Sequence, residues 1–289
     1  MSVPHIFEDI DKLLEAGSTI IGIGDDYFAA RCAAVFSRDE MKEAVSLIHQ
    51  REGKCVVFIN RMLGEEEIAK AREYLGFLKE LKVDYLLYND PAMYILAEEL
   101  GMVTQLIYQP DTLMTNSKDV SFMLRQGIDS VFISKELTFD EMMEIGNACK
   151  DKCNVIIHGY LNMSYSKRKL LKAYFDMLGK EVDYTSMDLR LIEYTRTGRM
   201  PIYEDEQGTH IFTDYILESF REIKAFSGVV RFLMIDSMFM EIEAVLGAIK
   251  AYKAIIEGED PEVIEQQYRE QYDLPLSDGY HYTKTNLVK

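Results

Sequence analysis

The amino-acid sequence predicts an α/β fold, a TIM-like (β/α) barrel formed by a single domain with an excursion after the sixth strand. Apolar segments of strand length alternate with amphipathic segments of helical length. The strands are apolar along their whole length, which is typical of a parallel sheet covered by helices. Six such units precede residue 171, and this number favours a closed barrel over an open, doubly wound sheet.

Apolar spacing and end signals place each element in chain order. The strands are expected at residues 19–24, 54–59, 83–88, 103–108 and 128–133, and a sixth strand begins at residue 154. The helices are expected at residues 7–16, 37–52, 65–81, 92–100, 118–126 and 138–150. Capping boxes start two of these helices, because Ser37 and Thr138 are each followed three residues later by a glutamate. Glycines such as Gly17 and Gly101 end helices.

The regular alternation ends after residue 171. Residues 172–197 contain no clear strand and residues 201–206 are acidic, so we expect an excursion from the barrel at about residues 172–207. Beyond it the sequence predicts a strand at residues 209–212, a helix at 215–225, a strand at 229–235, helices at 241–257 and 261–272, and a polar, aromatic tail at 274–289. The C-terminal helices and tail thus occupy residues 241–289, and residues 1–289 are expected to form one domain.

The composition indicates an acidic cytoplasmic protein. The 289 residues carry a net charge of −17, which repels a phosphate backbone at long range, so nucleic-acid contact requires a local basic patch or a basic partner. The first residues lack the apolar core of a secretion signal, and no apolar run is long enough for a membrane span. Four cysteines in a chain of this size indicate a reducing cytoplasm rather than a disulfide framework.

The stretch at residues 154–171 concentrates reactive side chains where a strand ends, and barrels present their chemistry at the carboxyl ends of strands. The candidate catalytic residues are His158, Glu136, Ser164, Tyr165 and Ser166. Glu136 ends the neighbouring fifth strand, so it is expected to meet His158, raise the pKa of the imidazole and orient it. The competing interpretation of His158 is a structural histidine that hydrogen-bonds to a nearby carbonyl. The competing interpretation of the acids is that strand ends are polar simply because they are exposed to solvent.

Polar residues at other strand ends and in the following loops supply candidate substrate-binding groups. These are Asn60, Arg61, Gln109, Asn116, Asn162, Lys167 and Asp236. The basic run at residues 167–169 suits a phosphate, and a solvated first helical turn is the alternative interpretation. No metal site is expected, because Cys149 and Cys153 have no second pair that would complete four ligands.

Several segments share their spacing with one known family. Residues 158–169 resemble the HGALCxSYSGxC hallmark of peptidase family U-32, the collagenase-like proteases of bacteria. Residues 109–116 resemble the STQMxxxN segment of that family, residues 135–137 its RELS segment, and residues 204–212 its acidic stretch before GTYIF. The resemblance covers about residues 18–255, and it implies a barrel fold, in agreement with the alternation of strands and helices.

The departures from the family pattern concern its cysteines and its glycines. The two hallmark cysteines fall on Asn162 and Lys169, and the hallmark glycine falls on Lys167. The Cys-rich stretch of the family corresponds to residues 172–200, which contain no cysteine, and its Glu-Gly-Arg is lost at residues 235–240. Longer relatives hold an iron–sulfur cluster with such cysteines. The resemblance therefore implies that this chain binds no such cofactor, because the thiolates are missing.

The resemblance also implies a function. Short members of this kind accompany a longer relative, and they are similar to proteins implicated in hydroxylation of the wobble uridine of transfer RNA in Gram-positive bacteria. The leading hypothesis is a cytoplasmic partner subunit of a longer, cluster-bearing U-32 relative, which contacts tRNA only indirectly or through that partner and has no membrane association.

Two alternatives stay open. The first is a peptidase or other hydrolase that uses His158 and Glu136 with Ser164 or Ser166, although the sequence has no Gly-x-Ser-x-Gly elbow and no HExxH zinc motif. The second is a barrel that binds a small molecule at its mouth through His158, Glu136, Arg61 and Asn60.

Overall fold

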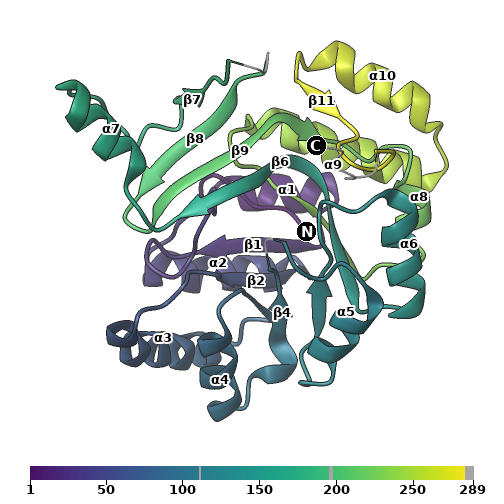
Figure 1. Cartoon of the computed structure of the whole chain (residues 1–289). Helices are drawn as coiled ribbons and strands as arrows, with labels where there is room; N and C mark the ends of the chain where they lie inside the picture. The colour runs from purple at the N-terminus through teal and green to yellow at the C-terminus, as the bar shows by residue number, and fades with distance from the viewer. Residues whose placement is uncertain (111, 195–197, 284–289) are drawn as a thin grey trace.

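The computed structural model describes residues 1–110, 112–194 and 198–283. Its centre is a barrel of parallel strands (Figure 1). The strands of the ring are β1 (Ile20–Gly24), β2 (Lys54–Ile59), β3 (Tyr85–Tyr88), β4 (Leu106–Tyr108), β5 (Ser130–Phe132), β6 (Cys153–Ser166) and β10 (Phe232–Ile235). Strands β1 to β6 pair in chain order, and β10 pairs with the other edge of β6, all in parallel.

A single residue closes the ring between β10 and β1. Ser2 forms parallel bridges to Ile21 of β1 and to Ile235 of β10. Its amide donates to the carbonyl oxygen of Ile20 at 3.0 Å, and its own carbonyl accepts from the amide of Gly22 at 2.8 Å. The predicted TIM-like barrel is therefore confirmed, and its last position is filled by a segment too short to be recognised as a strand.

Alternating side chains of the strands divide the core into two layers. Val56 and Phe58 of β2 belong to an inner cluster that contains no helical residue, so this cluster fills the barrel. Cys55 and Val57 face outward into a larger cluster shared with the helices. This two-sided burial explains why the strands are apolar along their whole length.

Helices cover the outside of the barrel. They are α1 (Asp9–Ala16), α2 (Arg38–Gln50), α3 (Ile68–Leu81), α4 (Pro91–Glu99), α5 (Ser117–Leu124), α6 (Phe139–Ala148) and α9 (Ile242–Glu257), with short 3-10 turns at Glu65–Glu67 and Val103–Gln105. Both predicted capping boxes form, with Glu40 accepting from the amide of Ser37 at 2.8 Å and Glu141 accepting from the amide of Thr138 at 2.9 Å. No helix in the described ranges is long and apolar enough to cross a membrane.

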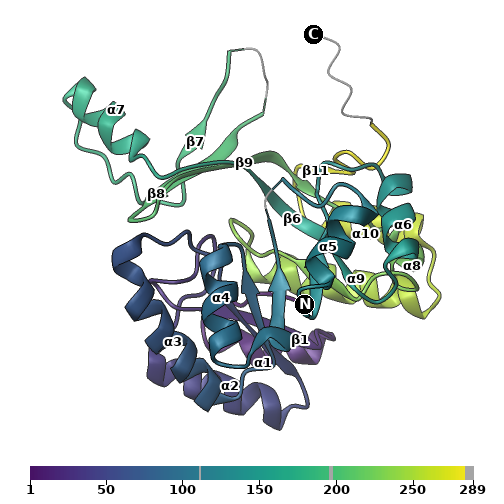
Figure 2. The same ribbon diagram turned by 60° about the horizontal axis from the view of Figure 1, so that its bottom comes forward.

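The excursion is a projecting arm, which we define as residues 159–217. It comprises the outer part of β6, α7 (Leu170–Leu178), β7 (Arg190–Leu191), β8 (Met200–Asp205) and β9 (Gly208–Leu217). Figures 1 and 2 show it extending from the barrel, with α7 near its tip. Strand β9 pairs antiparallel with both β6 and β8. The strand predicted at residues 209–212 therefore forms, but it belongs to the arm and not to the parallel barrel.

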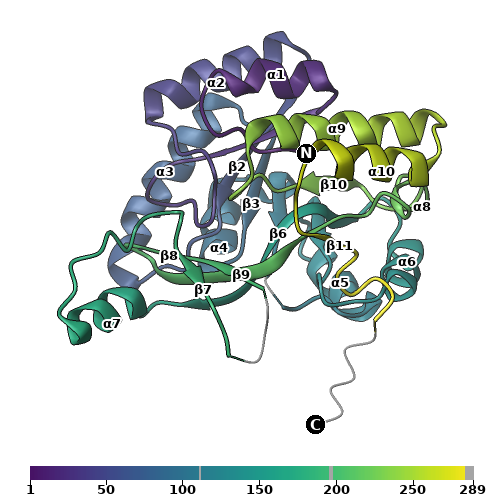
Figure 3. The same ribbon diagram turned by 90° about the horizontal axis from the view of Figure 1, so that it is seen from above.

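The C-terminal part also differs from the prediction. Residues 215–217 still belong to β9, and the helix expected at 215–225 is reduced to α8 (Ile223–Phe226). Helix α10 (Pro261–Gln271) packs on α9, as Figure 3 shows from above. The tail then adds a short strand, β11 (Leu276–Ser277), which pairs in parallel with the end of β9.

Gly159 marks the point where β6 leaves the barrel, and we expect Gly159→Ala to destabilise the fold strongly. Its φ is +125°, and a Cβ there would lie 2.4 Å from the backbone oxygen of Asp236. Backbone strain and the steric overlap with Asp236 together should lower the free energy of unfolding by about 3 kcal/mol or more. Gly101→Ala is the matched control, because Gly101 also has a positive φ of +70° but open space around it. Urea unfolding of both variants should separate them, and equal losses would refute the close-approach explanation.

Candidate functional site

Polar side chains gather around a cavity at the carboxyl ends of the barrel strands. They are Arg31, Asn60, Gln109, Lys135, Asn162 and Asp236. The floor is apolar and includes Phe58 and Phe132 from the inner cluster of the barrel. The cavity volume is about 50 Å³, which suits a few waters or one small charged group. We call this cavity and the residues that line it the mouth of the barrel. Four of the predicted substrate-binding residues, Asn60, Gln109, Asn162 and Asp236, are thus brought together there.

Among the described residues that line the cavity, one acid, Asp236, lies with two cations, Arg31 and Lys135. Asp236 follows β10, and its carboxylate accepts from the amide of Met238 at 3.1 Å. Desolvation by burial raises the pKa of Asp236 to about 6, while Arg31, Lys135 and His5 act in the opposite direction. The mouth can therefore change its charge in the physiological range of pH.

The loop after β1 positions Arg31. Its backbone has a φ of 54°, a left-handed conformation that is uncommon outside glycine. The loop is fixed from two sides, because Asn60 accepts from the amide of Ala30 at 2.8 Å and Gln207 of the arm donates to the carbonyl of Ala29 at 3.1 Å. Asn60 therefore shapes the mouth as well as lining it. Strained loop residues held by such contacts are frequent at binding sites.

His158 does not face the mouth. It is fully buried, and its Nδ1 and Nε2 lie 3.2 and 3.3 Å from the hydroxyls of Tyr252 and Tyr268 in the helical layer. Burial lowers the pKa of His158 to about 3, so the ring stays neutral at physiological pH. The expectation that Glu136 and His158 meet is wrong, because Glu136 is exposed and both ring nitrogens contact tyrosines.

The other catalytic candidates lie on the arm. Ser164 is exposed on the outer part of β6, and the hydroxyl of Ser166 accepts from the amide of Arg168 at 3.2 Å. Tyr165 donates to the carbonyl of Gln207 at 2.8 Å and stacks on His210 at a centroid distance of 4.8 Å. These contacts stabilise the arm. The structure does not assemble the serine–histidine pair on which the hydrolase alternative depends.

The remaining predicted binding residues have structural contacts or lie outside the cavity. Asn116 caps α5 by accepting from the amides of Lys118 and Asp119, both at 3.0 Å. Arg61 forms an ion pair with Glu67 at 2.7 Å. Lys167 is exposed at the start of the α7 region. Residue 111 lies outside the described part of the chain.

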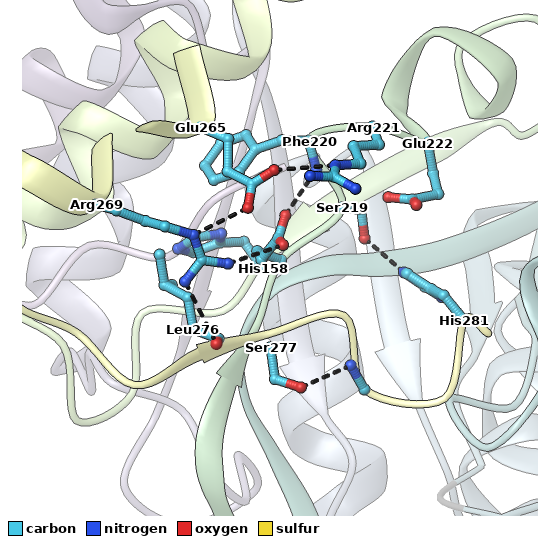
Figure 4. Close-up of polar contacts among 12 residues, drawn as sticks. His158, Ser219, Phe220, Arg221, Glu222, Glu265, Arg269, Leu276, Ser277 and His281 are labelled. Atoms are coloured by element: carbon cyan, nitrogen blue, oxygen red, sulfur yellow. Dashed lines mark hydrogen bonds and ion pairs between the residues drawn. The ribbon is translucent and has the colours of Figure 1, made fainter. Parts of the chain in front are cut away.

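A second polar cluster surrounds the C-terminal segment near His158, as Figure 4 shows. Ser219 and His281 are joined at 2.8 Å, and Arg269 lies between Glu265 at 2.9 Å and Glu218 at 3.3 Å. Desolvation by burial raises the pKa of Glu218 to about 7. This cluster joins β9, α10 and the tail.

Glu218 predicts a pH dependence of stability. An unfolded glutamate has an ordinary pKa of about 4.3, so between about pH 4.3 and 7 the folded state keeps a proton that the unfolded state has lost. The free energy of unfolding should therefore fall as pH rises through this window, by an amount on the order of 1–3 kcal/mol. Glu218→Gln should remove most of that fall in urea titrations from pH 4.5 to 8. An unchanged pH profile in the variant would show that Glu218 is not responsible.

Arg31 and Lys135 are the functional candidates that the sequence prediction missed. Lys135 follows β5 and donates to the carbonyl of Asn162, so a polar strand end could have indicated it. Arg31 lies in an irregular loop, where no periodic pattern assigns the direction of a side chain.

The cysteines do not fit an iron–sulfur cluster. Cys55 lies in β2, and Cys149 and Cys153 lie near the start of β6, where the Cys153 thiol contacts the Cys149 carbonyl at 4.0 Å. Cys32 lies in the loop after β1. Asn162 and Lys169 stand where the hallmark cysteines are expected. Within the described residues, no group of three or more His, Cys, Asp or Glu side chains is arranged to hold a metal ion.

Fold and mouth together define a (β/α) barrel protein with a polar pocket at the carboxyl ends of its strands. The chain belongs to peptidase family U32, whose family model matches residues 6–286. The resemblance noted in the sequence is thus confirmed.

Two curated relatives come from Bacillus subtilis (strain 168). The chain is 29% identical over 261 residues to tRNA hydroxylation protein P2, and the alignment covers 88% of this chain and 84% of that protein. It is 22% identical over 267 residues to tRNA hydroxylation protein P1, with 89% of this chain and 63% of that protein covered. Among solved structures, a U32 peptidase matches with a TM-score of 0.49 and 14% identity, over 81% of this chain and 90% of that one.

Proposed function

We propose that this protein acts in the hydroxylation of the wobble uridine of tRNA, as a partner subunit of a longer U32 relative. The main support is the similarity to tRNA hydroxylation protein P2, which extends over most of both chains. The proposal places the protein in the cytoplasm with its tRNA substrate.

The partner role rests on what the side chains can supply. Asn162 and Lys169 replace the hallmark cysteines, so a cluster would have to come from the relative. The net charge of −17 disfavours tight binding of RNA by this chain alone. The buried, neutral His158 is not available as a general base at the mouth.

Deletion of the gene tests the proposal. In a host without a duplicate gene, loss of this chain should remove hydroxylated wobble uridine from tRNA, measured by mass spectrometry of digested nucleosides. Re-expression of the wild-type chain should restore it. Unchanged hydroxylation in every growth condition would refute the proposal.

A second candidate function is the binding of a small anion at the mouth. The observation that favours it is that both Arg31 and Lys135 line the cavity. Because the pKa of Asp236 is raised to about 6, an incoming anion meets a carboxylate at pH 7.5 and a neutral acid at pH 5.5. Sulfate, whose own charge is constant in this range, should therefore bind more tightly at the lower pH in calorimetric titrations. Asp236→Asn should bind equally well at both values. A wild-type affinity that does not change with pH would refute this prediction.

A further inference from the structure

Helix α7 exposes an apolar face to solvent. Leu170, Tyr174, Met177 and Leu178 recur at helical spacing, so they lie on one side of the helix. The exposed fractions are 52% for Tyr174 and 75% for Met177, and no residue of the helix is buried. Large apolar side chains gathered on one face of a projecting arm are typical of an interaction surface.

The protein holds this helix in a fixed position. Glu204 of β8 is fully buried, and its carboxylate accepts from the amides of Leu171 and Lys172 at 2.8 and 3.1 Å. Thr209 donates to the same carboxylate at 2.6 Å, and its hydroxyl accepts from the amide of Leu170 at 3.0 Å. A buried carboxylate thus accepts hydrogen bonds from the free backbone amides of the first turn of α7, where the helix dipole also favours negative charge. These hydrogen bonds from β8 and β9 therefore hold α7 in the orientation that exposes its apolar face.

The charge around the face differs from that of the rest of the chain. Residues 163–180 contain five cations and a single acid, Asp176, although the chain as a whole has a net charge of −17. The cations in this segment are Lys167, Arg168, Lys169, Lys172 and Lys180. A surface that complements the segment is apolar at its centre and acidic at its rim.

This combination distinguishes a protein partner from other occupants. Helix α7 has nine residues, which is short for a helix that lies in a membrane interface, and the acidic body of the protein is repelled by anionic lipid. RNA would use the cations, but Tyr174 is the one aromatic ring of the exposed face, and leucine and methionine offer bases no stacking platform. A symmetric pairing of two α7 faces would bring two basic segments together.

We propose that α7 docks into an apolar, acid-rimmed groove of the longer U32 relative. The proposal rests on the proposed function for the identity of the partner, and on the exposed face and its charge for the location. It assigns to the arm the task of joining the two proteins, with Glu204 as the residue that positions the helix.

Pull-down and calorimetry with the purified longer relative from the same organism test the proposal. The double variant Tyr174→Asp/Met177→Asp should weaken binding by about tenfold or more. The matched control is Phe122→Asp/Val263→Asp, because Phe122 and Val263 are also about half exposed, at 56% and 51%, but lie on α5 and α10. The control should bind like the wild type, and wild-type binding should weaken as salt is raised. Circular dichroism and thermal midpoints should show that all chains fold alike.

Other results would overturn the docking proposal in distinguishable ways. Equal binding by the wild type and the α7 variant places the interface elsewhere and leaves the proposed function intact. A wild-type dimer that becomes a monomer in the α7 variant, or loss of tRNA binding in the α7 variant alone, assigns the face to a second copy or to RNA. If the wild type does not bind the relative, the docking proposal falls together with the partner-subunit part of the proposed function. The role in tRNA hydroxylation falls only when deletion also leaves hydroxylation unchanged.

Discussion

His158→Ala is expected to lower the free energy of unfolding by about 3–4 kcal/mol. The substitution leaves a cavity beside Phe220, whose ring centroid lies 5.8 Å from that of His158. It also removes the group that contacts the buried hydroxyls of Tyr252 and Tyr268. Urea unfolding monitored by circular dichroism measures the change.

Ser164→Ala is the control for this prediction. Ser164 belongs to the same hallmark segment, but its side chain is exposed, so its loss should change stability by less than about 0.5 kcal/mol. A His158→Ala protein that is as stable as the wild type but cannot support tRNA hydroxylation would contradict the structural role and return His158 to the list of catalytic candidates.

The double variant Arg31→Ala/Lys135→Ala is expected to reduce hydroxylated wobble uridine by about tenfold or more in a complemented deletion strain. Both are cations in the described lining of the mouth cavity, and without them an anionic ligand would lose charged partners. Their removal should affect function more than folding, because both side chains lie at the open end of the barrel rather than in its core. Nucleoside mass spectrometry gives the readout.

Arg125→Ala/Lys150→Ala is the matched control, since these exposed cations lie just after α5 and α6, away from the cavity. It should restore hydroxylation like the wild type. Full activity in the Arg31/Lys135 variant would show that the mouth cations are dispensable, and the site would then have to be sought on the arm.

The barrel could be predicted because each of its main strands lies in an apolar segment that is recognisable alone, although β4 and β5 have only three residues each. Its closure could not, because Ser2 completes the ring through isolated bridges without forming a strand. The loss of the regular alternation after residue 171 predicts the arm as an excursion, but the sequence does not show that β9 belongs to it. Residues 209–211 pair with both antiparallel neighbours, β6 and β8, and sequence periodicity does not distinguish such pairing from a buried parallel strand.

Residues of the candidate site could be predicted where they follow a regular strand, and not where the strand is irregular. Asn60, Gln109 and Asp236 follow strands, so the barrel topology alone brings them to one end. His158 was misplaced because the pairing of β10 with β6 shifts between Met234 and Ile235, which leaves Ile157 unpaired. This bulge places Ile157 and His158 on the same, helix-facing side. A one-residue irregularity thus reverses the direction of a side chain.

The most direct test of the central claim is the amount of hydroxylated wobble uridine in tRNA from a host that lacks both this chain and its longer relative. Three strains would express this chain alone, the relative alone, or both. The partner-subunit account predicts that hydroxylation returns fully only when both are present. Full hydroxylation with this chain alone, or with the relative alone, would contradict it.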